Sequence, residues 1–414
     1  MTLKNIFLST CVTFIAACNN NPAPKQSSSS PDSTAVAETY GFDAAFLKKH
    51  NRHVIELESP DGRSKILLSA DYQGRVMTST TNGDRGTSFG WINYALIESG
   101  KFNQQFNPVG GEERFWLGPE GGQYALYFKE FDSFSISSWQ VPALIDTVAY
   151  DLTSADKTNA VFSKNAMLTN YNGTAFNFQI ERKIALLDRS ALEHELKIDL
   201  TDSIQMVAYA SDNSIRNTGN EKWTQNKGLL SIWLLGMFNP SPHTFVIIPF
   251  HPLPGAKNYI TDNYFGEVPE NRLIIKDSIL YFTCDGKLRS KIGLSPKIAK
   301  PFAGSFDFQK NILTILFFPV EGDGLYVNSK WEQQQFPYKG DVVNAYNDGP
   351  LPDGSQLGMF YEIESSSAAR ELAPGELLRH RQITSHFEGP YLQLRSLAMQ
   401  LLGVDLNDIN PALK

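Results

Sequence analysis

Residues 53–84 read HVIELESPDGRSKILLSADYQGRVMTSTTNGD, and this stretch decides the fold class. Two runs rich in apolar and β-branched residues each end at a turn signal, Pro-Asp-Gly after the first and Asn-Gly-Asp after the second. Apolar and polar residues alternate from Val54 to Leu57, as in a strand that buries one face. The stretch therefore predicts consecutive strands joined by tight turns.

Strand-like runs of this kind recur roughly every 10–15 residues along the chain. Further runs are QYALYF (123–128), NFQIERKIALLD (177–188), LEHELKIDL (192–200), LLSIWLLGMF (229–238), TFVIIPF (244–250), RLIIKDSILYFTCDG (272–286), ILTILFFPV (312–320) and FYEIES (360–365). Helical patterns are few: one covers residues 44–50, and the other runs from Pro390 to Val404. No repeat of constant period and no linker-like composition appears after residue 40. We expect an all-β protein, a large antiparallel β-sandwich whose single domain spans residues 40–414 and ends in a short helix.

The first 17 residues have the order of an export signal. Lys4 precedes an apolar run, Ile6 to Ala17, that is too short to span a bilayer. Ile15-Ala16-Ala17-Cys18 resembles the lipobox of bacterial lipoproteins, in which the cysteine is acylated and becomes the first mature residue. We therefore expect residues 1–17 to be removed and Cys18 to carry lipid. An ordinary secretory signal with an incidental Cys18 is the alternative.

Residues 18–39 are predicted to be a flexible, lipidated tether. They are rich in Ser, Pro and Asn and contain almost no large apolar side chain, so they cannot bury enough surface to offset the entropy of ordering. Lipid at Cys18 would attach the body to a membrane. Asn19 rather than Asp follows the cysteine, which by the same resemblance implies the outer membrane of the cell envelope.

Charge, cysteine content and motifs argue against several classes of function. The net charge is −7 with no basic stripe, so we expect no nucleic-acid partner. Cys284 is the one cysteine beyond the signal and the lipidation position, and its apolar run indicates core packing. The sequence has no Gly-rich phosphate loop, HExxH motif, paired cysteine cluster or Gly-x-Ser-x-Gly elbow, so no cofactor is expected. Glu321 and Asp323 would suit Ca²⁺, but a hairpin turn explains the same loop, and no metal site is assigned.

One polar stretch, GGEERFWLGPEGG at residues 110–122, indicates a ligand site. Its glycines allow positive φ and close approach, and its charged residues can donate to and accept from hydroxyl groups. Trp116 offers a flat apolar face, and Pro119 fixes the turn that presents Glu120. We expect ligand contacts from Arg114, Trp116 and Glu120. The alternative is a wide loop held by an Arg114–Glu120 ion pair, with Trp116 in the core.

Four stretches in chain order resemble the galactose-mutarotase-like superfamily, which includes the aldose 1-epimerases. They are LLSADYQGRVMTST (67–80), GGEERFWLGPEGG (110–122), SDNSIRNTG (211–219) and YEIESSSAARELAPGELLRHRQ (361–382). The second of them resembles uncharacterised lipoprotein relatives of that superfamily. Each motif is short, but together they cover most of residues 50–390. The resemblance implies a supersandwich fold and a carbohydrate ligand in its cleft.

By this resemblance, Glu364 occupies the position of the glutamate that takes a proton from the sugar's anomeric hydroxyl. Glu362 lies two residues earlier and should point to the same face of its strand. Residues 205–238, where chain order would place the family's histidine acid, contain no histidine. His251 lies just beyond and is the weak candidate for that role, although a structural role in a turn is the alternative. For Glu364 the alternative is a solvated strand carboxylate.

Asn213, Asn217 and Trp139 complete the predicted ligand contacts, since amides bind hydroxyls and an indole can stack on a sugar ring. Turn formation is the alternative for the asparagines. Trp233 is expected in the core.

We therefore expect a lipid-anchored envelope protein whose mutarotase-like domain binds a sugar or glycan without catalysis. The first alternative is an active epimerase or other carbohydrate-active enzyme that uses Glu364 as base. A second alternative is an envelope protein whose partner is another protein.

Overall fold

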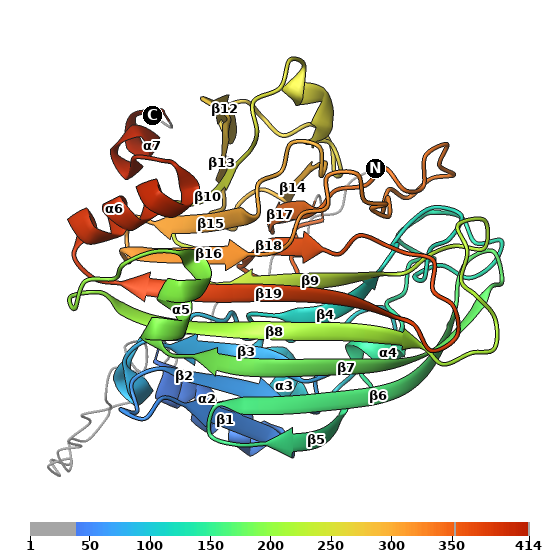
Figure 1. Cartoon of the computed structure of the whole chain (residues 1–414), viewed down its shortest axis with the longest axis horizontal. Helices are drawn as coiled ribbons and strands as arrows, with labels where there is room; N and C mark the ends of the chain where they lie inside the picture. The colour runs from blue at the N-terminus through green and yellow to red at the C-terminus, as the bar shows by residue number, and fades with distance from the viewer. Residues whose placement is uncertain (1–38, 352, 413–414) are drawn as a thin grey trace, which may run out of the picture.

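The computed structural model describes residues 39–351 and 353–412, and it is built on antiparallel β-sheets (Figure 1). A three-stranded sheet contains β1 (Val54–Glu58), β2 (Lys65–Ser69) and β3 (Arg75–Thr80). A six-stranded sheet has the order β11-β14-β17-β18-β9-β4, and a ten-stranded sheet has the order β12-β13-β10-β15-β16-β19-β8-β7-β6-β5. Every pairing in these sheets is antiparallel. The all-β sandwich predicted from the sequence is confirmed.

The strands of the two large sheets have the following bounds. The six-stranded sheet is made of β4 (Arg114–Gly118), β9 (Ser231–Phe238), β11 (Ile260–Thr261), β14 (Ser290–Leu294), β17 (Val343–Asn347) and β18 (Tyr361–Ser366). The ten-stranded sheet is made of β5 (Asp151–Ala155), β6 (Asn159–Thr169), β7 (Ala175–Leu187), β8 (Gln205–Asn217), β10 (Thr244–Pro249), β12 (Leu273–Lys276), β13 (Ile279–Thr283), β15 (Phe302–Asp307), β16 (Ile312–Phe317) and β19 (Leu377–Glu388).

Short helices flank these sheets. They are α2 (Tyr40–His50), α3 (Tyr94–Ser99), α4 (Ala143–Asp146), α5 (Arg189–Leu196), α6 (Tyr391–Leu402) and α7 (Leu406–Ala412), with 3₁₀ turns η1 (Gly83–Arg85) and η2 (Ala256–Tyr259). The predicted helices near residues 44–50 and at the C-terminus are confirmed as α2 and α6. Within the described ranges, no helix is both long enough and apolar enough to cross a membrane. The predicted signal peptide, Cys18 and the tether up to residue 38 lie outside the described residues.

The core lies between the two large sheets, and a second apolar layer covers the far face of the larger one. Strand β8 shows how alternation divides its side chains: Tyr209 packs with Phe115 and Leu234 of the six-stranded sheet, whereas Ala208 packs with helix residues such as Leu397. The far-face layer contains Leu192 and Leu196 of α5 and Leu394, Leu397, Ala398 and Leu401 of α6. One face of the six-stranded sheet is therefore used by the core, and its opposite face is left for other side chains.

Two strand predictions were wrong, and both errors have a local cause. Residues 189–196 form helix α5, because Asp188 caps the backbone N–H of Ala191 at 2.8 Å and Leu192 and Leu196 fall on one helical face. Residues 123–128 form turns that pack their aromatic rings inward, without strand pairing. The strands that were not predicted are β4, β5, β6, β11, β14, β15 and β17. Cys284 is fully buried and unpaired, which agrees with its predicted packing role.

Candidate functional site

The free face of the six-stranded sheet carries charged and aromatic side chains from four of its strands. Strand alternation places Phe115 of β4 on one side of the sheet and Arg114 and Trp116 on the other. Trp116 is buried and belongs to the same apolar cluster as Phe115, which agrees with the alternative that places it in the core. Trp116 lies directly opposite Trp233 in the β4–β9 register, and their ring centroids are 5.5 Å apart. We call this the polar face and define it by the following residues: Arg114, Trp116, Trp233, Lys291, Glu362 and Glu364.

Two ion pairs cross the polar face. Arg114 Nη2 lies 2.5 Å from Glu362 Oε1, and Lys291 Nζ lies 2.8 Å from Glu364 Oε2. The Trp233 indole N–H donates to the same Glu364 oxygen at 2.9 Å. Glu364 is fully buried, so the predicted alternative of a solvated strand carboxylate is wrong. Burial raises the pKa of Glu362 to about 7, although the Arg114 guanidinium opposes this shift.

The loop that follows β4 adds Glu120 and aromatic rings to one side of the polar face. Trp139 donates its indole N–H to Glu120 Oε1 at 2.8 Å, and Trp139 stacks on Trp331 with centroids 5.9 Å apart. Burial raises the pKa of Glu120 to about 6, against the opposing effects of the Lys291 charge and the Trp139 hydrogen bond. Arg114 pairs with Glu362 instead of Glu120, so the predicted alternative of an Arg114–Glu120 bridge is wrong.

The opposite side of the polar face is formed by Lys291 and by two loop residues, Tyr264 and Asp341, none of which was predicted from the sequence. Lys291 of β14 places its amine 4.8 Å from the centroid of the Trp233 ring and 5.5 Å from that of Tyr264. Tyr264 donates its hydroxyl to Asp341 at 2.6 Å. Burial raises the pKa of Asp341, while this hydrogen bond opposes the shift. Trp233 is buried in the main apolar cluster, as predicted, and it also borders this charged group.

Several buried polar atoms of the polar face have no hydrogen-bond partner within the described part of the chain. They are Arg114 Nε and Nη1, Trp116 Nε1 and Glu364 Oε1. Ser231 Oγ is also buried without a hydrogen-bond partner there. Ser231 lies opposite Gly118 and two residues before Trp233 on β9. Buried polar groups in folded proteins are nearly always satisfied, and each exception calls for an explanation. Their concentration on one face makes this buried cluster the candidate functional site.

The first half of the glycine- and glutamate-rich stretch is structural. Glu113 turns into the space between the sheets, where it lies 2.7 Å from Arg182 Nη2 and accepts from Ser211 Oγ at 2.8 Å. Gly110 has φ +100°, and a Cβ there would lie 2.0 Å from the Trp91 carbonyl oxygen. Glycine is therefore required where the chain turns into β4.

The structure does not bring the predicted asparagines or the predicted histidine to the polar face. Asn213 accepts from Arg182 Nε at 2.9 Å inside the buried network, and Asn217 donates to the Glu221 and Leu372 carbonyls at the end of β8. His251 is exposed beyond β10, and within the described residues no hydrogen bond joins its ring to a polar-face side chain.

No group of three or more metal-ligating side chains occurs in the described ranges 39–351 and 353–412. In the loop considered for Ca²⁺, Arg370 Nη2 lies 2.8 Å from both carboxylate oxygens of Glu321.

A model of a family of unknown function (DUF6786) matches residues 38–413. No curated protein matches the sequence.

Solved structures that are similar include the Slr1438 protein from Synechocystis, at 12% identity and a TM-score of 0.48, covering 82% of this chain and 97% of that one. A galactose mutarotase related enzyme from Lactobacillus acidophilus is 10% identical with a TM-score of 0.44, covering 80% and 97% of the two chains. A galactose mutarotase-like protein from Lactobacillus casei is 10% identical with a TM-score of 0.44, covering 81% and 99%. Two of these solved structures are named as galactose-mutarotase-related or galactose-mutarotase-like proteins, the superfamily that the sequence motifs resemble.

Proposed function

The chain belongs to DUF6786, a family of unknown function, and for this member we propose that the polar face binds a carbohydrate. The observation that carries the proposal is the set of unpartnered buried donors and acceptors on Arg114, Trp116 and Glu364. A ligand that offers many hydroxyl groups can satisfy donors and acceptors together, because each hydroxyl donates one hydrogen bond and accepts others. A purely apolar ligand would leave these atoms unsatisfied at a cost of about 1–3 kcal/mol each.

Aromatic rings beside these polar atoms favour a sugar over other hydroxyl-rich ligands. Trp139 and Trp331 are half-buried and stacked, and Trp116 lies between the rings of Phe106, Tyr127 and Trp233. A pyranose has an apolar face of C–H groups as well as a polar rim, so it can pack on an indole while its hydroxyls reach the charged groups. Mixed apolar and polar linings of this kind are typical of small-molecule sites.

The direct test is a ligand screen with the full chain, by saturation-transfer NMR and calorimetry, against aldoses and short oligosaccharides. We expect saturable binding to at least one sugar. We expect a loss of roughly tenfold or more in affinity for Glu120→Ala, because hydrogen bonds to charged groups contribute about 1.5–3 kcal/mol. Glu181→Ala is the matched control, since Glu181 is an exposed carboxylate on β7 that does not line the polar face. Absence of binding across the panel would contradict the proposal and favour a protein partner.

A second candidate function is epimerisation of the bound aldose, and the position of Glu362 beside Glu364 on β18, with its raised pKa, favours it. The pKa of Glu362 is raised to about 7, so near neutral pH this carboxyl is available as an acid, while Glu364 two residues away is paired with Lys291. Ring opening needs a base to take the anomeric hydroxyl proton and an acid to protonate the ring oxygen as the C–O bond breaks. In this proposal Glu364 is the base, and a neutral carboxyl takes the part for which no histidine is positioned.

Anomer exchange recorded in the same NMR samples separates the two candidates. Under the epimerase hypothesis, Glu364→Gln keeps measurable sugar binding and loses exchange. Saturation transfer without exchange in the unaltered protein would leave a binding module.

The location of the protein is a separate proposal that rests on the sequence. Lipid at Cys18 would anchor the folded body to the cell envelope, with the outer membrane as the preferred destination. Labelling cells with palmitate tests it: Cys18→Ser should lose the label and release the protein from the membrane fraction. A labelled Cys18→Ser protein would exclude this attachment point.

A further inference from the structure

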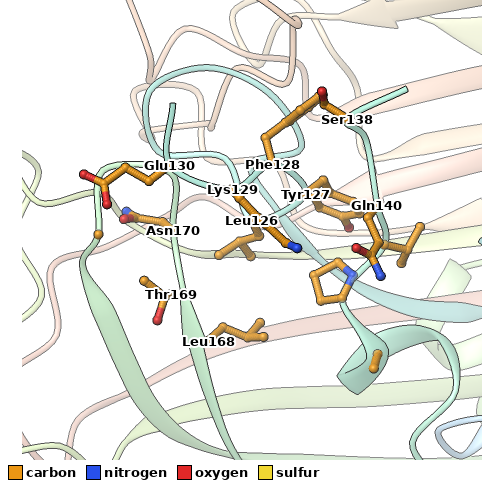
Figure 2. Close-up of a pocket in the computed structure, with 14 residues that line it drawn as sticks. Leu126, Tyr127, Phe128, Lys129, Glu130, Ser138, Gln140, Leu168, Thr169 and Asn170 are labelled. Atoms are coloured by element: carbon orange, nitrogen blue, oxygen red, sulfur yellow. The ribbon is translucent and has the colours of Figure 1, made fainter. Parts of the chain in front are cut away.

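A second concave site lies outside the polar face, between the loop that follows β4 and the β6–β7 hairpin (Figure 2). Its cavity has a volume of about 380 Å³, which is toward the small end of the range for ligand pockets, roughly 300–1,000 Å³. Apolar and aromatic groups form much of its lining: Leu126, Tyr127, Phe128, Val141, Pro142 and Leu168. Polar side chains add hydroxyl, amide and charged groups: Lys129, Glu130, Ser138, Gln140, Thr169 and Asn170. We call this site the loop pocket.

The loop pocket and the polar face lie on two sides of the same chain segment, and each is lined by different side chains. Ser138 and Gln140 line the pocket, whereas Trp139 between them bonds to Glu120 beside the polar face. Tyr127 lines the pocket and stacks on the Trp139 ring, with centroids 6.3 Å apart and an interplanar angle of 9°. The pocket is therefore a distinct site with its own polar groups.

Lys129 gives the loop pocket its chemical character. Figure 2 shows its amine directed toward the space between Leu126 and Gln140, while the Glu130 carboxylate points away. Within the described residues, the amine forms neither an ion pair nor a hydrogen bond. The nearby carboxylate of Asp132 accepts from the backbone N–H of Lys129 at 3.2 Å instead. An ammonium beside an apolar wall attracts an anion more strongly than one fully surrounded by water.

Other groups of the loop pocket can bind hydroxyls. The Ser138 and Thr169 hydroxyls form no hydrogen bond within the described chain, and Gln140 uses its amide N–H on the Gln104 carbonyl at 2.8 Å, which leaves its oxygen free. Tyr127 and Pro142 supply flat apolar surface on the same cavity. A ligand that matches all three features carries a negative charge, several hydroxyls and an apolar ring face.

We propose that the loop pocket binds a hydroxylated organic carboxylate of sugar size, a hexuronate, through the free ammonium of Lys129. This site is independent of the carbohydrate site proposed on the polar face.

The test is calorimetry and saturation-transfer NMR of the full chain with glucuronate and galacturonate, and with glucose, galactose and inorganic phosphate as comparison ligands. We expect the uronates to bind and the corresponding neutral sugars to bind this pocket roughly tenfold more weakly, since the ion pair contributes about one tenfold step. Uronate affinity should fall as salt is raised, because the ammonium is partly exposed to solvent. No uronate binding, or uronate binding that is unchanged in Lys129→Gln, would overturn the proposal, whereas a neutral sugar bound at the polar face should be unaffected by Lys129→Gln. Phosphate that competes fully with uronate would show a simple anion site and overturn the sugar part.

Variants separate this pocket from the polar face and from nonspecific charge effects. Lys129→Gln should remove the preference for uronates, whereas Lys183→Gln, at an exposed lysine of β7 outside the pocket, should not. Leu168→Trp should exclude the ligand by filling the cavity without changing charge. Lys129→Gln should leave binding of a neutral sugar at the polar face unchanged, so failure of the polar-face proposal is distinguishable from failure here. Uronate binding that survives both Lys129→Gln and Leu168→Trp would contradict the assignment.

Discussion

Replacing Arg182 should cost more stability than any change at an exposed arginine, because it breaks a buried ion pair. Arg182 and Glu113 are both fully buried, with Nη2 and Oε1 2.7 Å apart. Arg182 also donates to Asn213 Oδ1 at 2.9 Å and to the Gln73 carbonyl at 3.2 Å. Arg182→Met would leave a carboxylate without its counter-charge in the core. Removing one partner of such a pair costs about 3–5 kcal/mol in the free energy of unfolding.

Urea denaturation followed by circular dichroism measures this loss, and a second substitution identifies its cause. Glu113→Gln added to Arg182→Met should recover a large part of the lost stability, because it removes the uncompensated charge and keeps the shape. Arg379→Met, at an exposed position of β19, should stay within about 0.5 kcal/mol of the unaltered protein. A loss below about 1 kcal/mol for Arg182→Met, or no recovery in the double variant, would refute the assignment of a buried charge pair.

The pH dependence of the same variant has a defined sign. Burial raises the pKa of Glu113 in the folded protein, and Arg182 opposes this rise. A carboxyl whose folded-state pKa is raised contributes stability at low pH that is lost as pH rises through that pKa. Without Arg182 the rise is unopposed. The deficit of Arg182→Met relative to the unaltered protein should therefore be smaller near pH 4 than near pH 7.5.

Three further predictions concern the polar face and the approach to it. The folded-state pKa of Glu120 is raised by burial from 4.5 to about 6. The contribution of this carboxyl to folding stability is therefore present below about pH 4.5 and lost above pH 6. In urea titrations, the free energy of unfolding of Glu120→Gln relative to that of the unaltered protein should rise by about 1–2 kcal/mol between pH 4 and pH 7.5. Gly110→Ala should lower the Tm through a positive φ and a clash with the Trp91 carbonyl oxygen, at a cost of about 1–3 kcal/mol; an unchanged Tm would contradict this. Trp233→Phe removes the N–H that donates to buried Glu364 and should cost about 1–3 kcal/mol by urea denaturation, and a smaller loss would show that Lys291 alone satisfies that oxygen.

The sequence predicted the strands and candidate residues that follow from local pattern or from short motifs. Alternation and turn signals predicted the strands from Val54 onward. The glycine- and charge-rich stretch singled out Arg114, Trp116 and Glu120, the resemblance singled out Glu364, and the fold brings these four residues to one region. Helix α5 was missed because residues spaced four apart suit a helix while the intervening polar residues imitate strand alternation. The capping Asp188 was the available signal for a helix start at that point.

Lys291 and Tyr264 were not predictable from local pattern, because strand register brings them to the site. Lys291 follows a short loop in a stretch that shows neither a motif nor clear alternation. Its place on the polar face depends on β14 pairing with β17, and on β17 pairing with β18. Register between strands separated by tens of residues is fixed by the whole packed sheet, so a single segment does not reveal it.

The same registers show why the charges of the polar face form two pairs instead of one mixed cluster. In strand register, Arg114 and Glu364 are both opposite Leu235, while Lys291 and Glu362 are both opposite Tyr346. Each cation nevertheless bonds to the glutamate that does not share its register position: Arg114 bonds to Glu362, and Lys291 bonds to Glu364.

This crossing has a consequence for ligand binding. Both cations reach β18 across an intervening strand and draw the two carboxylates toward opposite edges of the sheet. Neighbouring strands lie about 4.8 Å apart, so a strand two places away is roughly 10 Å away and only long side chains can make such contacts. Glu364 keeps one oxygen without a partner, and Arg114 keeps Nε and Nη1 without partners. These unpartnered atoms belong to groups that ion pairs already hold in place. A bound hydroxyl would therefore meet pre-positioned donors and acceptors, and the entropy cost of ordering these side chains on binding would be small.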